Sequence, residues 1–251
     1  MLVAVAFYAT FLEPDAIEVT RHTMEAPLRE PLKIAHLTDL HTRGLGRRER
    51  RLLAMLDAER PDLIVITGDT VSDVGTSEMC RALLERLHAP LGVWAVKGNW
   101  EHWKPRRNER ELYESAGVRL LINAGHAVRG DLWIAVLDDA GTVHPDLEAA
   151  LSGMPKHAFV LALFHSPAYF DRIAGRCNLA LAGHTHGGQV RFPFLGPLWL
   201  PNGCGRFVQG WYQQNGSHMY VSRGIGTSLL PVRFLCRPEL ALIRVGHEPR
   251  R

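Results

Sequence analysis

The segment 183-GHTHGG-188 decides the fold that we expect, because two histidines in it directly follow a short apolar run. That run, Leu179 to Ala182, has the length and composition of a buried strand. In extended chain His184 and His186 project to the same side, so both imidazoles can bind one metal ion. Ligand-type residues at the carboxyl end of a strand are typical of α/β sheets, where ligands bind at that edge.

Four earlier apolar runs end in the same way. They are the predicted strands Leu32 to Leu37 before Asp39 and His41, Leu63 to Thr67 before Asp69, Val93 to Lys97 before Asn99, and Ala158 to Leu163 before His165. Each motif alone occurs by chance, but their ordered recurrence after successive strands points to one site. A set of Asp, Asn and His ligands suits a divalent ion such as Mn, Fe, Zn or Ni. It does not suit a structural zinc site, because such sites are rich in cysteine thiolates. The ligands outnumber those that one ion needs, so we expect two divalent ions.

The rest of the chain completes a layered pattern. A further strand is predicted at Leu132 to Leu137, and helices at Arg47 to Arg60, Ser77 to Leu87, Asn108 to Ala116, Pro145 to Leu151 and Pro167 to Ala174. After residue 186 we expect long loops and antiparallel strands at Gln189 to Phe192, Phe207 to Tyr212, His218 to Val221 and Leu240 to Val245. We therefore predict one αββα-like domain over residues 31–251, with residues 1–30 as an appendage.

Composition excludes several classes of protein. The 251 residues are 46% hydrophobic and 22% charged, unlike a disordered, collagen-like or coiled-coil chain. Lys plus Arg is 29 and Asp plus Glu is 26, a net charge of +3 with no basic stripe, so we expect no nucleic-acid partner. The four cysteines form no C-x-x-C pair and are interpreted as buried thiols.

The first twelve residues, MLVAVAFYATFL, are apolar but shorter than the roughly 20 residues of a membrane-spanning helix. They also lack the basic residues and the cleavage site of a secretory signal. Two interpretations remain from the pattern: a membrane-dipping or truncated anchor helix, and a first helix or strand packed in the core.

The order DLH (39–41), GD (68–69), GN (98–99), H (165) and GHTH (183–186) resembles the calcineurin-like metallophosphoesterase superfamily. The runs GHTHGGQVRFPFLGPL and YVSRGIGTSLLPVRF are similar to a membrane-associated bacterial subgroup of cell-envelope phosphodiesterases and UDP-2,3-diacylglucosamine hydrolases. The resemblance covers about residues 30 to 245 and implies a four-layer αββα sandwich with mixed sheets. In that subgroup a membrane anchor commonly precedes a segment like Glu18 to His22, which favours the anchor interpretation.

The resemblance also implies roles for the ligands. One ion would be held by Asp39, His41 and His186, and the other by Asn99, His165 and His184, with Asp69 bridging them. Such ions, Mn first and Fe, Zn, Ni or Mg as alternatives, share a hydroxide that attacks phosphorus. No protein nucleophile is required, and no G-x-S-x-G motif surrounds Ser166.

One position departs from the family pattern. The family usually has histidine directly after the asparagine, and here that residue is Trp100. His102 can take its place, a good leaving group can make the acid unnecessary, or activity can be weak; we favour His102. The residues expected at the reacting centre are thus His102, Asn99 and Asp69.

Several side chains near the motifs are candidates for substrate binding. The guanidiniums of Arg43, Arg191 and Arg223 could clamp phosphate oxygens, or be solvated or structural. Trp100 and Trp103 could form an apolar wall for a lipid chain, or pack under the loop. Thr38 and Asp73 are candidates for hydrogen bonds to the ligands.

The function expected from these features is a binuclear phosphodiester or pyrophosphate hydrolase acting on a lipid-linked substrate such as UDP-2,3-diacylglucosamine. The expected location is the bacterial cytoplasmic membrane, with peripheral contact or an N-terminal anchor, on a side that the sequence leaves open. The alternatives are a generic cell-envelope phosphodiesterase, and a catalytically weak, metal-dependent binding module.

Overall fold

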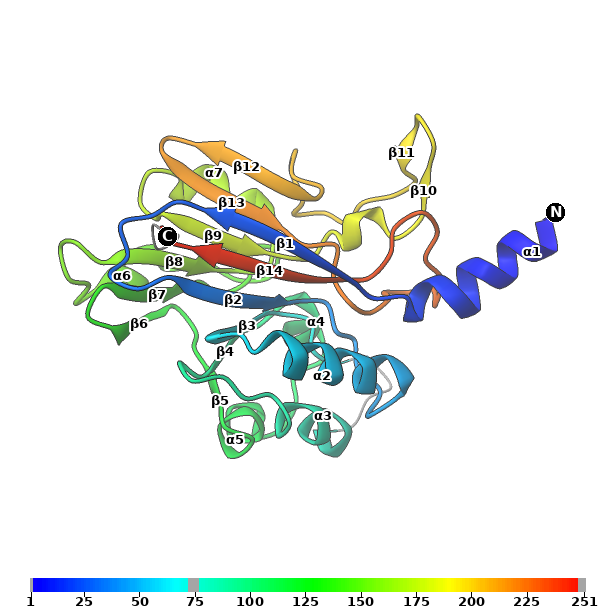
Figure 1. The fold of residues 1–251 in the computed structure, drawn as a ribbon, viewed down its shortest axis with the longest axis horizontal. Helices are drawn as coiled ribbons and strands as arrows, with labels where there is room; N and C mark the ends of the chain where they lie inside the picture. The colour runs from blue at the N-terminus through cyan, green and yellow to red at the C-terminus, as the bar shows by residue number, and fades with distance from the viewer. Residues whose placement is uncertain (1, 72–76, 248–251) are drawn as a thin grey trace.

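Two six-stranded sheets form the centre of the protein in a computed structural model that describes residues 2–71 and 77–247 (Figure 1). The first sheet has the order β1 (Glu18–Met24), β14 (Glu239–Val245), β2 (Leu32–Leu37), β3 (Leu63–Thr67), β4 (Val93–Val96), β5 (Val118–Leu120). The second has the order β12 (Gly210–Gln214), β13 (Ser217–Val221), β9 (Leu179–Ala182), β8 (Phe159–Leu163), β7 (Leu132–Val136), β6 (Ala124–Arg129).

Both sheets are mixed. Strands β2 to β5 run parallel, while β14 pairs antiparallel with β2 and parallel with β1. In the second sheet β7, β8, β9 and β13 are parallel, and β6 and β12 add antiparallel edges. The predicted mixed α/β sandwich is confirmed.

Helices cover the outer faces of the two sheets. Leu52 of α2 (Arg47–Glu59), Leu83 of α3 (Ser77–Leu84) and Leu112 of α5 (Glu109–Ser115) are buried in one cluster with the outer side chains of the first sheet. α6 (Leu147–Leu151) and α7 (Phe170–Ile173) cover the second sheet. Between the sheets Ile34, Trp94 and Leu161 belong to a third cluster, so the layers are αββα. Strands covered on both faces explain the continuous apolar runs of the sequence.

The chain begins with α1 (Leu2–Phe7), continues as the π-helix η1 (Tyr8–Leu12), and reaches the 3-10 turn η2 (Glu13–Asp15). Among the described residues no helix has the length and apolar character needed to cross a membrane. Strand β1 was not predicted, and its pairing with β14 makes residues 18–24 part of the first sheet. The division of the chain at residue 30 stays a prediction.

The region after residue 186 contains η4 (His186–Gly188), the small hairpin β10 (Arg191–Phe192) and β11 (Gly196–Pro197), and the antiparallel pair β12 and β13. The predicted strand Phe207 to Tyr212 lies instead at Gly210–Gln214, and only Arg191–Phe192 of the predicted strand Gln189 to Phe192 is a strand. The short elements α4 (Asn99–Trp103) and η3 (Pro167–Tyr169) follow β4 and β8.

Candidate metal centre

All seven predicted metal ligands lie together, buried, where the carboxyl ends of β2, β3, β4, β8 and β9 meet. On one side, His186 Nε2 lies 3.3 Å from both Asp39 Oδ1 and His41 Nε2. On the other side, His165 Nε2 lies 3.0 Å from both Asn99 Oδ1 and His184 Nδ1. Between them, Asp69 Oδ2 lies 3.6 Å from His41 Nε2 and 3.4 Å from His165 Nε2. Two groups have ligand atoms within 4.8 Å of one another: Asp39, His41 and His186, and Asp39, Asp69 and His165.

The backbone at these ligands is unusual. Positive φ angles occur at five of the seven, namely Asp39 (50°), His41 (39°), Asp69 (52°), His184 (71°) and His186 (50°). This left-handed region is uncommon for residues with a Cβ, and strained backbone of this kind clusters at functional sites. The strain turns side chains from separate strand ends toward a common point.

Glu101, a residue that the sequence analysis did not single out, holds the Asp69 loop in place. Its buried carboxylate accepts hydrogen bonds from the backbone N–H groups of Gly98, Asp69 and Thr70 at 2.8, 2.9 and 2.7 Å. Burial, and then the nearby Asp69 charge, raise the pKa of Glu101 to about 7. A glutamate three residues after Gly98 matches a capping box, which is the signal that could have identified it.

The region after β13 supports Asp39 from the other side. Ile225 N donates to Thr38 O (3.1 Å) and Gly226 N donates to Asp39 O (2.6 Å). Arg233, fully buried, folds this loop by donating to the carbonyls of Arg223, Gly224, Gly226 and Cys236. Thr38 Oγ1, as predicted, hydrogen-bonds a ligand, donating to Asp39 Oδ2 at 2.9 Å. Asp73 lies outside the described residues.

The imidazole tautomers show that the site fits a cation. His165 Nδ1 lies 2.7 Å from Thr67 O and His184 Nε2 lies 2.6 Å from Asn202 O, so each of these nitrogens donates its proton to a carbonyl. The other two nitrogens, His165 Nε2 and His184 Nδ1, lie 3.0 Å apart. Their lone pairs then face each other, unless one nitrogen carries a proton or a metal ion binds them. A carbonyl that fixes the tautomer of a histidine is the usual support of a metal ligand.

The charges of the cluster are consistent with this. Burial raises the pKa of Asp39 to about 6 and lowers the pKa of His41 to about 4. Burial raises the pKa of Asp69 as well, but the adjacent His165 outweighs it and the pKa falls to about 2. Burial, and then the neighbouring His41, lower the pKa of His186 well below its usual value. Burial acts to lower the pKa of His165, but the Asp69 charge outweighs it and raises this pKa well above its usual value. Without a metal ion, a proton on His165 therefore supplies the positive charge that faces Asp69. His41 and His186 are neutral imidazoles, the form in which histidine binds a divalent transition-metal ion.

Gly98 allows the close approach of this loop, and replacing it tests the geometry. A Cβ at Gly98 would lie 2.2 Å from Asp69 Oδ1, although φ there is −102°, which an alanine accepts. We expect Gly98→Ala to displace Asp69, lower metal content, and destabilise the fold by about 1–3 kcal/mol through overpacking. Elemental analysis and urea unfolding would measure this. Gly130→Ala is the matched control, because no atom lies within 4 Å of its added Cβ; equal behaviour of the two variants would contradict the account.

A cavity of about 590 Å³ opens beside the cluster. Asp69, Asn99, His184 and His186 lie in its wall. The rest of the wall is largely apolar and includes both predicted tryptophans, Trp100 and Trp103, together with Leu198, Trp199, Pro201, Leu229, Leu230 and Val232. The Trp100 ring also stands edge-on to His41, with centroids 5.3 Å apart. Candidate metal ligands thus share one cavity with a wall that is otherwise mostly apolar.

The three predicted arginines differ in their surroundings. Arg43 lines a cavity of about 140 Å³ together with His41 and Trp100. Arg191 donates to Gly187 O at 2.7 Å, and Arg223 pairs with Glu18 at 2.9 Å and Glu239 at 3.4 Å. Arg43 is therefore the better placed of the three, and substrate binding by any of them stays a prediction.

His102 is held on the side of the cluster formed by Asn99 and His165. Its Nε2 lies 2.6 Å from Oδ1 of Asp138, the second residue after β7. The next residue, Asp139, accepts a hydrogen bond from Ser166, which directly follows His165. His102 is not among the residues that line the 590 Å³ cavity, so its predicted role in place of Trp100 requires a test.

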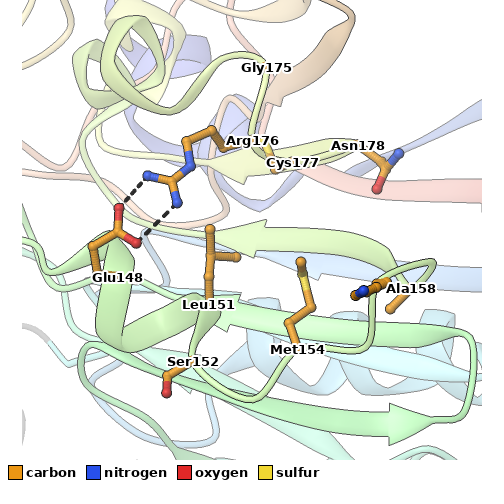
Figure 2. A pocket seen from close by; sticks show the side chains of 10 residues that line it. Glu148, Leu151, Ser152, Met154, Ala158, Gly175, Arg176, Cys177 and Asn178 are labelled. Carbon is orange, nitrogen blue, oxygen red and sulfur yellow. Dashed lines mark hydrogen bonds and ion pairs between the residues drawn. The ribbon is translucent and has the colours of Figure 1, made fainter.

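A second hollow, of about 760 Å³, lies at the opposite edge of the second sheet, before β8 and β9 begin. Figure 2 shows Glu148 and Arg176 joined by an ion pair across it, with Leu151, Met154 and Cys177 nearby. None of the predicted ligands lines this hollow, so it is not the candidate site.

The geometry agrees with comparisons to known proteins. The family model for calcineurin-like phosphoesterase matches residues 32–188. The chain belongs to this family. This calcineurin-like protein is 34% identical over 250 residues to the metallophosphoesterase YkuE of Bacillus subtilis, covering 94% of this chain and 87% of the relative. It is also 30% identical over 265 residues to the phosphodiesterase YaeI of Escherichia coli (95% and 92%), and 28% identical over 258 residues to a metallophosphoesterase of Aquifex aeolicus (98% and 98%). It is a metal-dependent phosphoesterase.

Proposed function

We propose that this phosphoesterase uses two divalent ions to hydrolyse a phosphodiester or pyrophosphate bond in a lipid-linked substrate at a membrane surface. The observation that carries the proposal is the 590 Å³ cavity, which joins four candidate ligands to a predominantly apolar wall. The E. coli relative that bears the name phosphodiesterase supports a diester as the substrate class.

Two ions fit the donor atoms better than one. Asp39, His41 and His186 form one compact group, and Asn99, His165 and His184 form a second chain of contacts. Asp69 Oδ2 lies within 3.6 Å of His41 and 3.4 Å of His165, so its carboxylate reaches both. When bound, two divalent ions supply a water of lowered pKa and neutralise charge on the phosphoryl oxygens.

The chain's own residues would position the reaction. Trp100 N donates to Asp69 Oδ1 at 2.9 Å and leaves Oδ2 facing the histidines. Thr67 O fixes the His165 ring. The indoles of Trp100 and Trp103 line the cavity and offer an apolar surface to an acyl chain. His102 would donate a proton to the leaving oxygen.

The test compares a lipid and a soluble diester. Protein loaded with Mn should hydrolyse UDP-2,3-diacylglucosamine in detergent with a lower KM than bis(p-nitrophenyl) phosphate. Trp199→Ala, in the apolar wall, should raise KM for the lipid by about tenfold and affect the small diester less. Turnover of the soluble diester alone would exclude the lipid substrate and favour a generic phosphodiesterase. Absence of turnover with full metal content would favour a binding module.

The acid role of His102 gives a pH prediction. The hydrogen bond from His102 to Asp138 raises the pKa of the imidazole against the effect of burial, Asp139 raises it further, and Lys97 lowers it. An acid must be protonated, so activity should fall as pH rises through this raised pKa. Asp138→Asn should move that alkaline limb to lower pH.

His102→Ala should lower kcat about 10²-fold for a diester with an alkyl leaving group. The loss should be smaller for bis(p-nitrophenyl) phosphate, whose leaving group needs no proton. Equal losses for both substrates, or an alkaline limb that Asp138→Asn does not move, would exclude His102 as the acid.

A further inference from the structure

We propose that three exposed apolar segments, two of which line the metal-site cavity while the third contacts one of them, form one docking surface for an anionic phospholipid bilayer. The segments are the helical residues 2–12, the β10–β11 hairpin region 191–199, and the loop 229–235. This inference deepens the proposed membrane function and rests on it for the nature of the substrate. The docking itself is measured independently of catalysis.

The three segments are joined to one another. Arg233 N donates to Ala9 O at 2.9 Å, and Leu235 N donates to the buried carboxylate of Glu13 at 3.0 Å. Phe234 packs its ring against Phe192 of the hairpin, with centroids 6.3 Å apart. Figure 1 shows α1, β10 and β11 extending from the same end of the molecule. The segments therefore form a continuous surface.

Several large apolar residues on this surface are exposed to solvent. Phe194, Leu229 and Leu235 are 108%, 75% and 52% exposed. All three have positive φ, at 67°, 60° and 52°, where glycine or asparagine would be less strained. Large apolar side chains that are both strained and solvent-exposed indicate an apolar partner outside the chain.

The helical segment has the character of an interfacial element. Residues 2–12 contain no charged residue, and none of them is buried. At about 1.5 Å per residue the segment is roughly 16 Å long, about half of a hydrocarbon core of about 30 Å. It can enter a bilayer without crossing it. The ring centroids of Phe7 and Phe11 are 5.3 Å apart, and both side chains are exposed.

Exposed arginines outnumber the acidic residues Glu13 and Asp15 at the base of the helix, where lipid headgroups would lie. The guanidinium of Arg47 is 4.0 Å from Asp15, and those of Arg51 and Arg237 donate to the carbonyls of Asp15 and Ala16. All three arginines are exposed. Apolar side chains with flanking arginines complement anionic phospholipid rather than a second protein surface, and each cation near the membrane favours binding.

The cavity mouth belongs to this surface. Leu198, Leu229 and Leu230 lie both in the docking segments and in the cavity wall. A lipid in the bilayer could therefore move its phosphate to the candidate ligands while its chains stay in contact with apolar groups.

Vesicle sedimentation tests the proposal, with full-length protein and vesicles of equal parts phosphatidylcholine and phosphatidylglycerol. The wild type should bind, and more weakly to pure phosphatidylcholine. Phe194→Asp and Phe11→Asp should each lower the partition coefficient about tenfold or more. Met79→Asp, at an exposed position on α3, should not lower it. All variants should hydrolyse bis(p-nitrophenyl) phosphate at the wild-type rate, since neither Phe194 nor Phe11 lines the cavity.

Two results would overturn the docking proposal. One is a wild-type protein that does not bind the anionic vesicles; if it formed dimers that these substitutions disrupt, the surface would be a contact between two copies of the chain. The other is equal vesicle binding by the wild type and both phenylalanine variants. Vesicle binding without hydrolysis of any diester would instead leave the docking surface intact and remove the proposed catalytic function.

Discussion

Asp69→Asn is expected to lower kcat/KM for bis(p-nitrophenyl) phosphate by about 10³-fold or more. Asparagine preserves the shape and the hydrogen bond from Trp100 N but removes the negative charge that faces His41 and His165. Because the same oxygen reaches both groups of ligands, the variant should also hold less metal. Steady-state kinetics and elemental analysis on one preparation would measure both effects.

Asp62→Asn is the matched control for this variant. Asp62 is a partly buried aspartate that accepts a hydrogen bond from Lys33 N at 2.7 Å, near the start of β2 and away from the ligands. We expect its replacement to leave kinetics and metal content near the wild-type values. An Asp69→Asn protein with wild-type turnover would exclude Asp69 as a shared ligand.

Removal of metal by a chelator should lower the melting temperature by about 10 °C. Without cations, the buried Asp39 and Asp69 carboxylates and the facing lone pairs of His165 and His184 are left uncompensated. Ligand at about a thousand times its Kd contributes about 4 kcal/mol, and 1 kcal/mol shifts Tm by about 2–4 °C in a protein of this size. Differential scanning calorimetry before and after adding Mn back would record the change.

The Asp69→Asn variant is the control for that measurement as well. It should show a smaller rise in Tm on addition of Mn, because the site has lost a charged ligand. A wild-type protein whose Tm is the same with and without metal would show that the cluster is satisfied by protons alone.

The sequence was sufficient for the strands that carry the site. The apolar runs before Asp39, Asp69 and His165 lie at the predicted positions, because strands buried on both faces need uninterrupted apolar residues. The parallel order of β2, β3 and β4 in one sheet, and of β8 and β9 in the other, gathers the ligands of each sheet at one edge. The packing of the two sheets then brings these two groups of ligands together, and local sequence does not encode that step.

Other strands gave no clear signal. β1 and β6 are edge strands with polar residues such as Arg21 and His126, and their pairing depends on partners distant in sequence. β5 has only three residues, too few for a periodic pattern. Strand pairing in the tertiary structure decides such elements, so local propensity misses them.

Around the site, hydrogen bonds across the fold were the part that could not be predicted. The capping-box spacing indicates the hydrogen bond of Glu101 to Gly98 N, but not its bonds to the Asp69 loop, which is distant in sequence. Arg233 organises the loop against Asp39 by binding backbone carbonyls, which any type of residue supplies. Likewise Arg191 and Arg223 lie near the motifs, yet their guanidiniums bind groups of the protein itself. Proximity in sequence did not reveal which arginines were already occupied.

The number of metal ions bound per chain tests the central claim most directly. After reloading with Mn and removal of free ion, elemental analysis should find two ions per wild-type chain and about one in His184→Ala, which keeps the group of Asp39, His41 and His186. A wild-type chain that binds one ion or none under these conditions would contradict the account of a two-metal phosphoesterase.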